Sequence, residues 1–256
     1  MNRQVISARG ISKVFYNQNS SLEVLKDISF DLEKGQSIGI VGASGSGKTT
    51  LLHIVCGLEN PNSGEVLVNG KEISSLSFDE KALLRSKEIG FVYQFHHLLE
   101  EFSALENVAL PLLIAGQSMI SAKETSAKFL TSIGLEGRLG HRPSQLSGGE
   151  RNRVHLAKLL KAGGNVLLLD EPTNDLDVET LRALENALLE FPGCAMVISH
   201  DRWFLDRVAT HIMDYRDEGK INFFEGNYSD YESWLKQEFG QDVVEPHRLK
   251  YKRMSK

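Results

Sequence analysis

Residues 42–49 constrain the possible folds of this chain more than any other segment. They read GASGSGKT and match the pattern G-x-x-x-x-G-K-[ST] at every position. An apolar run at 38–41 comes directly before them, and a helical pattern begins at Thr49. Between a strand and a helix, such glycines let backbone N–H groups turn towards phosphates, and the start of the helix adds partial positive charge. The segment therefore predicts a nucleotide-phosphate loop in an α/β domain.

The side chains of this loop have separate expected tasks. We expect Lys48 to reach the β- and γ-phosphates of a nucleotide and the Thr49 hydroxyl to hold Mg²⁺. The alternative is a chance glycine-rich turn, which the Lys-Thr pair and the preceding strand disfavour. The candidate phosphate-binding residues are Gly42, Ala43, Ser44, Gly45, Ser46, Gly47, Lys48, Thr49 and Thr50.

A second segment supplies the acids that such a loop needs. Residues 166–171 read VLLLDE, an apolar run of the kind found in central parallel strands, ending in two carboxylates. We expect Asp170 to enter the Mg²⁺ shell. Glu171 follows directly and is the candidate general base that polarises the attacking water. The alternative is a strand that ends in ordinary surface acids. A complete phosphate loop in the same chain disfavours it.

The composition fits one large α/β domain. The chain has 256 residues, of which 41% are hydrophobic and 25% charged, as in globular proteins. The net charge of -5 gives no overall attraction to nucleic acid or membranes, so no direct DNA binding is expected. No apolar run reaches the roughly 18 residues that span a bilayer, and residues 1–10 lack a signal-peptide pattern. We therefore expect a cytoplasmic protein in which Cys56 and Cys194 are reduced core thiols.

Hydrophobic patterning predicts alternating strands and helices. Runs of strand length occur at 24–30, 37–41, 65–68, 89–93, 166–169 and 195–199. Helical patterns occur at 49–56 and 181–190, and from about 95 to 160 with breaks at Pro111, Gly134 and Pro143. Asn69 and Gly70 predict a hairpin turn. This alternation favours a mostly parallel sheet with helices on both faces.

Residues 146–150 carry a third motif. They read LSGGE and resemble the signature of ATP-binding-cassette (ABC) ATPases. A Ser-Gly-Gly turn that opens a helix makes an anion site, although alone it could be a flexible turn. The resemblance implies that Ser147, Gly148 and Gly149 contact the γ-phosphate of ATP held by the opposite subunit. The expected partner is therefore a second cassette, in a homodimer that encloses two ATP molecules.

Further motifs follow in the order of the ABC family. Gln94 resembles the Q-loop glutamine, which senses Mg²⁺ and the attacking water and so counts as both a metal and a catalytic candidate. Residues 175–177 resemble the D-loop, which crosses the dimer interface. His200 resembles the switch histidine that contacts the γ-phosphate and is the third catalytic candidate. The aromatic residue that stacks on adenine is either Phe15 or Tyr16, with Phe15 taken as the candidate.

The resemblance also implies a fold and an activity. The fold is α/β, a P-loop NTPase ABC cassette with a parallel core sheet, an N-terminal antiparallel β subdomain and a helical subdomain at about 95–160. The cassette is expected at 1–238 and a basic tail at 239–256. The implied activity is hydrolysis of ATP with Mg²⁺.

The chain resembles two ABC subfamilies in turn. Up to about residue 145 it is similar to the ATPase subunit of lipoprotein-releasing transporters. The segments that carry this likeness are GFVYQFHHLL at 90–99, ALENVALPLL at 104–113 and HRPS at 141–144. The later part is similar to ABC-F translation factors. Its segments are SGGERNR at 147–153, DEPTNDLD at 170–177, SHDRWFLD at 199–206 and FEGNYSDY at 224–231.

Three functions follow from this double likeness. The first is the ATPase subunit of a transporter for lipoprotein release, peripheral on the inner membrane and bound to membrane subunits. We favour it here because the stretch at 94–143, which would touch that partner, is of transporter type. The second is a ribosome-associated translation factor, in which the basic residues at 247–256 contact rRNA phosphates instead of forming a solvated tail. The third is an uncoupled hybrid cassette.

Overall fold

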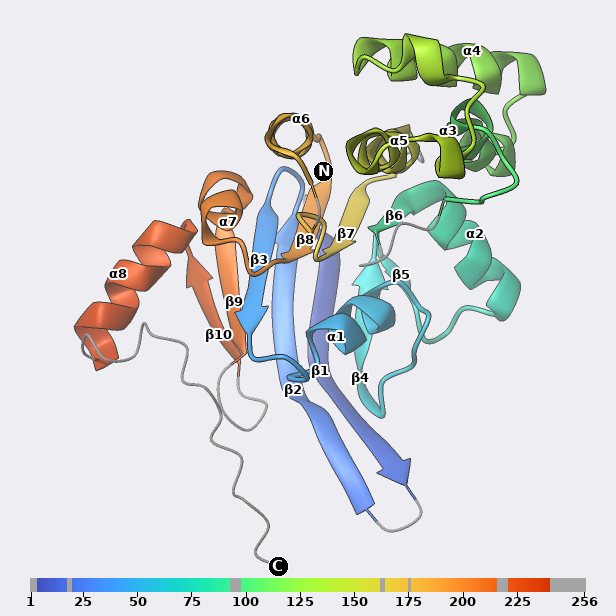
Figure 1. The fold of residues 1–256 in the computed structure, drawn as a ribbon. Coiled ribbons are helices and arrows are strands. Elements are labelled where there is room, and N and C mark those ends of the chain that lie inside the picture. The colour runs from blue at the N-terminus through green and yellow to red at the C-terminus, as the bar shows by residue number, and fades with distance from the viewer. Residues whose placement is uncertain are drawn as a thin grey trace, which may run out of the picture.

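The computed structural model describes residues 4–17, 20–92, 98–161, 164–174, 176–215 and 221–239. Figure 1 shows two β-sheets with helices around them. The four-stranded sheet contains β1 (Gln4–Asn17), β2 (Ser20–Glu33), β4 (Ser63–Val68) and β5 (Lys71–Glu72). The six-stranded sheet contains β3 (Ser37–Gly42), β6 (Ile89–Val92), β7 (Val166–Asp170), β8 (Cys194–Ile198), β9 (His211–Tyr215) and β10 (Ile221–Glu225). The helices are α1 (Lys48–Val55), α2 (Phe78–Glu88), α3 (Ala104–Ile114), α4 (Met119–Ser132), α5 (Gly148–Lys161), α6 (Val178–Leu189), α7 (Arg202–Val208) and α8 (Tyr228–Phe239).

The four-stranded sheet is antiparallel throughout, with the order β2-β1-β4-β5. It is the antiparallel β subdomain that the resemblance implied. Register shifts interrupt the pairing of β1 with β2. Bulges of this kind break the strict alternation of buried and exposed side chains. Asn69 (φ 48°) and Gly70 (φ 76°) both adopt left-handed backbone, as a two-residue hairpin turn requires, so the predicted turn between β4 and β5 is confirmed.

The six-stranded sheet has the order β10-β9-β3-β8-β7-β6. Its neighbours pair in parallel from β9 to β6, and only β10 is antiparallel. Every residue of β7, β8 and β9 is buried, as expected for parallel strands covered on both faces. In such sheets, ligands bind beyond the carboxyl ends of the strands. The candidate residues of the sequence follow the carboxyl ends of β3, β7 and β8.

Helices cover both faces of this sheet. On one face, Leu51 and Leu52 of α1 belong to a core that also contains buried residues of the antiparallel sheet, so α1 lies between the two sheets. On the other face, Leu156 of α5, Leu184 of α6 and Phe204 of α7 pack on the strands. The predicted parallel sheet with helices on both faces is confirmed.

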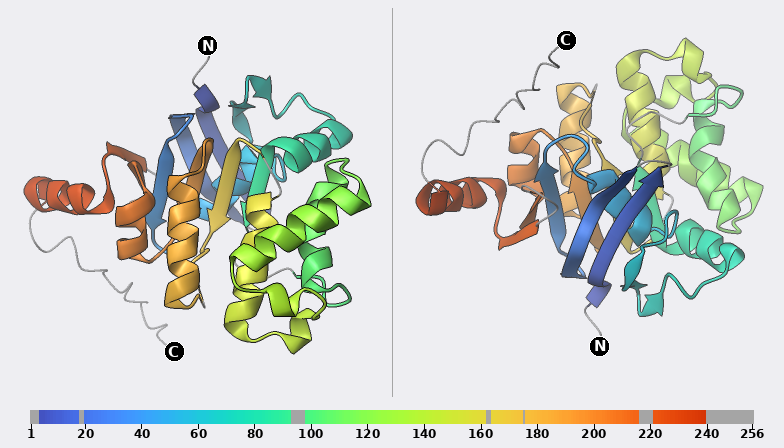
Figure 2. Two further views of the ribbon diagram at one scale, coloured as in Figure 1. Left: turned by 90° about the horizontal axis from the view of Figure 1, so that it is seen from above. Right: turned by 90° about the horizontal axis from the view of Figure 1, so that it is seen from below.

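The helical subdomain lies to one side of this sheet. Helices α3, α4 and α5 share a separate apolar core that includes Val108, Leu130 and Val154. Figure 2 shows these helices at one end of the molecule and α8 at the other. The short turns Glu136–Arg138 (η1) and Pro143–Gln145 (η2) connect α4 to α5.

One predicted break is wrong. Pro111 lies inside α3 and does not end it. A proline inside a helix loses one backbone hydrogen bond and crowds the carbonyl one turn earlier. Here α3 continues to Ile114, and the N–H of Ala115 donates to the carbonyl of Pro111 at 2.9 Å. The buried residues Val108 and Leu112 pack against neighbouring helices and offset the local cost. The other two breaks are confirmed, because Gly134 (φ 74°) follows α4 and Pro143 begins η2.

Two further expectations concern membranes and cysteines. Within the described ranges, no helix combines the length and apolarity that a membrane crossing requires. Cys56 and Cys194 are buried and unpaired. Burial raises the pKa of the Cys56 thiol to about 11 and that of Cys194 to about 12. Both are therefore protonated core thiols, as predicted.

Candidate nucleotide-binding and hydrolysis site

The loop between β3 and α1 has the backbone of a phosphate-binding turn. Gly42 and Gly47 have φ values of 140° and 100°, which glycine tolerates better than any other residue. A β-carbon on Gly42 would lie 2.7 Å from Cβ of Tyr215, and one on Gly47 would lie 2.6 Å from Cγ1 of Val24. Conformation and space therefore both require glycine at these two positions.

The side chain of Lys48 folds back over the loop. Its Nζ donates to the carbonyl oxygen of Gly42 at 2.9 Å and to that of Ala43 at 2.7 Å. Burial lowers the pKa of this ammonium, and the nearby carboxylates of Glu171 and Asp170 partly oppose that shift. Lys48 thus holds the loop closed and brings a cation to its centre.

The loop also contains an unsatisfied polar atom. The hydroxyl oxygen of Ser46 is buried and has no hydrogen-bond partner in the described structure. A buried hydroxyl without a partner is costly. Beside it the surface is open, because Ala43, Ser44 and Gly45 are exposed and a β-carbon on Gly45 would meet nothing within 4 Å. A phosphate oxygen over the loop fits both observations.

Thr49 and Asp170 come from different elements and meet beside this loop. Thr49 lies in the first turn of α1, and Asp170 ends β7. The Thr49 hydroxyl donates to Oδ2 of Asp170 at 2.7 Å. Hydroxyl and carboxylate oxygens are the ligands that Mg²⁺ prefers, usually together with phosphate oxygens of a substrate. The pair predicted from the sequence is therefore brought together, and its chemistry suits that ion.

Glu171 is held in an unusual conformation next to His200. Its φ of 50° is left-handed, and its N–H donates to the carbonyl of Ile198 at 2.9 Å. The N–H of His200 donates to Oε2 at 3.3 Å, and Nε2 of the same histidine lies 3.4 Å from Oε1. Burial raises the pKa of Glu171, although His200 opposes the shift. A carboxylate of raised pKa is suited to accept a proton from water near neutral pH.

Sequence reasoning did not single out the residues that flank this pair. The hydroxyls of Thr173 and Ser199 lie 3.0 Å apart, and the N–H of Asp201 donates to Oγ of Ser199 at 3.1 Å. The only sequence signal is that a small hydroxyl residue stands two positions after Glu171 and one before His200.

The signature segment forms a capped helix start. The N–H of Ser147 donates to Oε2 of Glu150 at 2.8 Å, and the N–H of Glu150 donates back to the Ser147 hydroxyl. Arg138 pairs with Glu150 at 2.7 Å. These hydrogen bonds lower the pKa of Glu150 to about 2, and the bond from the Ser147 N–H has the largest effect. A β-carbon on Gly149 would lie 2.4 Å from Oδ2 of Asp177, so the first turn of α5 abuts the start of α6.

The signature residues and the phosphate loop stay apart within this chain. Among the described residues, no hydrogen bond or ion pair joins Ser147 or the N-terminal turn of α5 to Lys48, Asp170 or Glu171. The nucleotide residues follow β3, β7 and β8, whereas Ser147 opens a helix of the helical subdomain. This separation agrees with the sequence-based expectation that the signature serves another subunit.

Two predicted residues are not placed by the structure. Gln94 and Asp175 lie outside the described residues, so their assignments remain predictions. The aromatic choice also remains open. Phe15 is 43% exposed, with the ammonium of Lys13 5.1 Å from its ring centre, and Tyr16 is 74% exposed. Both side chains are accessible enough to stack on a base.

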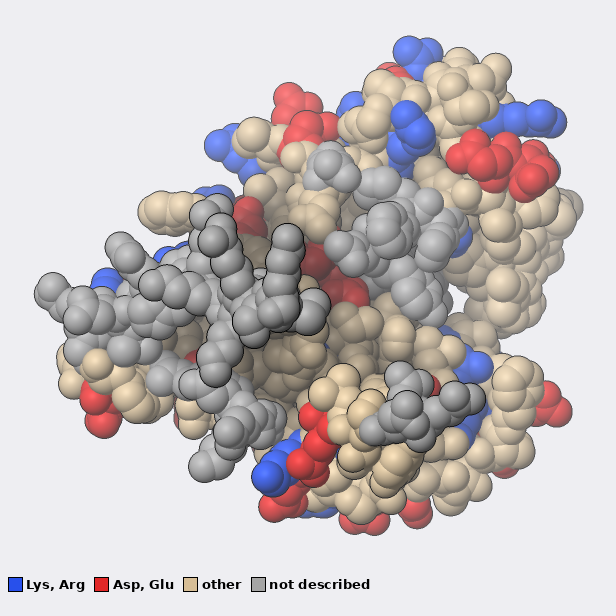
Figure 3. All heavy atoms as spheres, turned by 60° about the horizontal axis from the view of Figure 1, so that its bottom comes forward, with Lys and Arg blue, Asp and Glu red and all other residues tan. Residues whose placement is uncertain are grey.

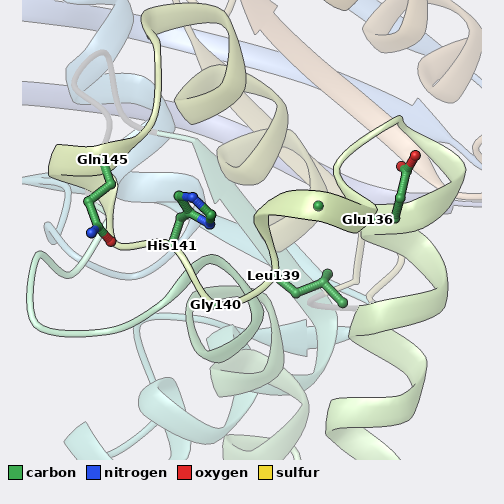
Figure 4. A pocket seen from close by; sticks show the side chains of 6 residues that line it. Glu136, Leu139, Gly140, His141 and Gln145 are labelled. Carbon is green, nitrogen blue, oxygen red and sulfur yellow. The ribbon is translucent and has the colours of Figure 1, made fainter.

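A separate hollow of about 380 Å³ lies on the helical subdomain. Figure 4 shows His141 and Gln145 at one end of it and Glu136 at the other. Its lining residues come from η1, η2 and the segment between them. None of them belongs to the phosphate loop or to the acids at the end of β7, so this hollow is not the nucleotide site.

The fold and the site together define a P-loop nucleoside triphosphatase. The family model described as ABC transporter matches residues 25–174, more than half of the chain. The chain therefore belongs to the ABC transporter family and is an ABC-type ATPase.

Two kinds of curated relative are similar to the chain. The energy-dependent translational throttle protein EttA of Haemophilus influenzae is 48% identical over 257 residues, covering 99% of this chain and 42% of the relative. EttA of Escherichia coli K12 is 49% identical over 91% of this chain and 39% of its own length. The lipoprotein-releasing system ATP-binding protein LolD of Idiomarina loihiensis is 45% identical over 78% of this chain and 90% of its own length. The chain thus spans about two fifths of the EttA relatives.

A solved structure shares the fold. The dimeric, post-hydrolysis state of the ATP-binding cassette MJ0796 bound to ADP and Pi has a TM-score of 0.78 and 29% identity, covering 86% of this chain and 98% of that one.

Proposed function

We propose that this chain is the ATP-hydrolysing cassette of an ABC-F type translation factor that acts on ribosomes. The observation that carries the proposal is the 48% identity to EttA across 99% of the chain. The likeness to LolD covers 78%, so the EttA likeness includes about a fifth of the chain that the LolD likeness leaves out. This reverses the order favoured from the sequence, in which lipoprotein release came first.

The proposed chemistry uses the residues that the fold brings together. Lys48 and the backbone of the phosphate loop bind the phosphates of ATP. Thr49 and Asp170 would hold Mg²⁺, which when bound neutralises charge on the β- and γ-phosphates. Glu171, with its raised pKa, accepts the proton of the attacking water. His200, whose ring lies beside that carboxylate, contacts the γ-phosphate.

The second half of the site comes from another cassette. Ser147, Gly148 and Gly149 stand at the exposed start of α5, where backbone N–H groups and the helix dipole favour an anion. In the described part of the chain, no hydrogen bond or ion pair joins them to the phosphate loop. The dimeric state of the related cassette supports a closed dimer in which each signature segment meets the ATP of its partner. The energy of ATP binding then drives closure.

The ribosome contact would be electrostatic. Figure 3 shows Lys and Arg side chains interspersed with Asp and Glu on the face that it presents. The net charge of the chain is -5, so the contact needs a local concentration of cations. The segment at 247–256, outside the described residues, carries five Lys or Arg and no acid. Contacts of such a segment to rRNA phosphates would weaken steeply with salt.

One observation keeps transport as a second candidate. The chain covers 90% of the length of LolD at 45% identity. The segments of transporter type lie mainly around α3, on the helical subdomain. A membrane partner that recognises that surface would make the chain a transporter ATPase in spite of its later sequence.

Cell fractionation separates the two functions. A tagged Glu171→Gln chain is followed with ATP into ribosome and inner-membrane pellets at low and high salt, beside a Lys48→Ala chain that should not bind ATP. The proposal expects ATP-dependent recovery with ribosomes at low salt and loss at high salt. Recovery with inner membranes, independent of ribosomes, would favour transport. Absence from both pellets would contradict both functions and leave the uncoupled hybrid.

A further inference from the structure

Glu171 and His200 follow different strands, so contacts between the segments after those strands must fix the positions of the two residues relative to each other. Glu171 comes directly after β7, and His200 comes two residues after β8. The N–H of Glu171 donates to the Ile198 carbonyl, and the N–H of His200 donates to the side-chain oxygen Oε2 of Glu171. The second of these, at 3.3 Å, is long and is made by a side chain that can rotate. It does not by itself fix the two segments.

The left-handed backbone of Glu171 has a free-energy cost that neighbouring contacts must offset. A non-glycine residue in a sparsely populated backbone region costs about 1–3 kcal/mol and persists only when neighbouring contacts over-determine it. On its amino side, Glu171 continues the buried strand β7. On its carboxyl side, the turn needs a contact outside itself to fix it. Asn174 is exposed, and among the described residues its N–H donates only to the carbonyl of Glu171, at 3.3 Å.

The hydroxyl of Ser199 supplies that anchor. Ser199 is 3% exposed, and its Oγ lies 3.0 Å from Oγ1 of Thr173. The same oxygen accepts the N–H of Asp201 at 3.1 Å. The Asp201 carboxylate in turn accepts the N–H of Phe204, which caps α7. One buried hydroxyl therefore links the turn after Glu171 to the start of the helix that follows His200.

We propose that Ser199 and Thr173 are a pair of positioning residues for ATP hydrolysis, whose hydroxyl contact fixes Glu171 relative to His200. Neither side chain is placed to touch the substrate in this account, and both act through the carboxylate and the imidazole. When the hydroxyl contact is lost, the turn after Glu171 is released, the left-handed backbone relaxes and the carboxylate moves. Displacement of a reacting group by about 1 Å can cost on the order of 100-fold in rate.

The direct test is a double-mutant cycle on ATPase rates of the full chain. Ser199→Ala and Thr173→Val each remove one hydroxyl. Each should lower kcat by roughly 10- to 100-fold and change KM for ATP by less than about twofold, because the phosphate loop is untouched. Once one hydroxyl is gone, loss of the other should add little, since contacting residues are not additive. Thr173→Ser keeps a hydroxyl and should retain most of the activity.

A matched control lies at the other end of the same sheet. Thr210 precedes β9, and its hydroxyl exchanges hydrogen bonds with the backbone of Ser37 at 2.9 Å in each direction. Thr210→Val therefore removes comparable bonds away from Glu171 and His200. It should lower the melting temperature and leave kcat unchanged. A fall in kcat for Ser199→Ala at a similar melting temperature would then come from the site and not from loss of folded protein.

The split between kcat and KM gives a readout that a purely structural role would not move. Displacement of Glu171 should lower kcat and leave KM for ATP nearly unchanged, and the hydroxyl of Thr173→Ser should restore kcat. The proposal is overturned if Ser199→Ala behaves like Thr210→Val in kcat. It is equally overturned if the Ser199 and Thr173 effects multiply in the double variant, or if Thr173→Ser loses as much activity as Thr173→Val.

Discussion

The hydroxyl of Thr49 donates a 2.7 Å hydrogen bond to Oδ2 of Asp170. The two residues are 121 positions apart in the chain, yet they join the first turn of α1 to the end of β7. This bond closes the site between the loop that binds phosphates and the strand that delivers the acids. Asp170 is 7% exposed, so its carboxylate depends on the partners that the chain or a ligand supplies.

Thr49→Val tests this bond. The variant keeps the shape of the side chain and leaves one oxygen of a buried carboxylate without its donor, which costs about 1–3 kcal/mol. We expect a lower free energy of unfolding without nucleotide and loss of Mg²⁺-dependent ATP hydrolysis. Thr49→Ser, which keeps the hydroxyl, should restore both in urea unfolding and phosphate-release assays. Full activity in the valine variant would remove Thr49 from the metal site.

Lys48→Ala tests the phosphate loop. The ammonium bonds two loop carbonyls, those of Gly42 and Ala43, and is the cation nearest to the expected phosphates. Its removal should abolish tight ATP binding, as measured by calorimetry. ATP affinity equal to that of the unmodified chain would contradict the assignment of this loop.

Substitution of two loop glycines separates the effect of a steric clash from the effect of backbone strain. Gly47 and Gly45 both have positive φ, at 100° and 80°. A β-carbon on Gly47 would also lie 2.7 Å from the Val24 carbonyl, whereas one on Gly45 would meet nothing within 4 Å. Gly47→Ala should therefore destabilise the fold more than Gly45→Ala, whose cost is limited to about 1 kcal/mol of backbone strain. Equal free energies of unfolding for the two variants would show that the close contact with Val24 does not matter.

The pKa of Glu171 predicts a pH-dependent stability. Burial raises the folded-state pKa above its usual value, so folding favours the protonated carboxyl. The favourable contribution is complete below the unfolded pKa of about 4.3 and is lost as pH rises through the raised value. Glu171→Gln should therefore raise the melting temperature near pH 8, and the gain should shrink as pH falls towards 4. The exposed Glu124 gives the control Glu124→Gln, for which no such trend is expected. A gain for Glu171→Gln that is constant with pH would show that this carboxyl does not carry the effect.

Local sequence predicts much of this site and less of the fold around it. The phosphate loop and the acids after β7 are contiguous motifs, so their chemistry could be stated from the chain alone. The left-handed backbone of Glu171 could not, because it depends on a hydrogen bond to Ile198 in a neighbouring strand. The contact of Thr173 with Ser199 likewise needs the pairing of β7 with β8.

Hydrophobic patterning does not predict β1 or α2, for similar reasons. β1 lacks clean alternation because bulges shift its pairing. Helix α2 buries only Leu84 and so gives no apolar period, although the capping box of Ser77 and Glu80 was a usable signal. Pro111 predicts a break because proline is costly inside a helix, but α3 packs against α4 and α5 and continues past it.

The molar mass of Glu171→Gln in solution shows whether two cassettes close around ATP. Light scattering is measured with and without ATP, because this variant should bind ATP and fail to hydrolyse it. We expect a monomer without nucleotide and twice that mass with ATP, and no change with ATP when Lys48→Ala is added. A Glu171→Gln chain that binds ATP and remains monomeric at high protein concentration would rule out the closed dimer.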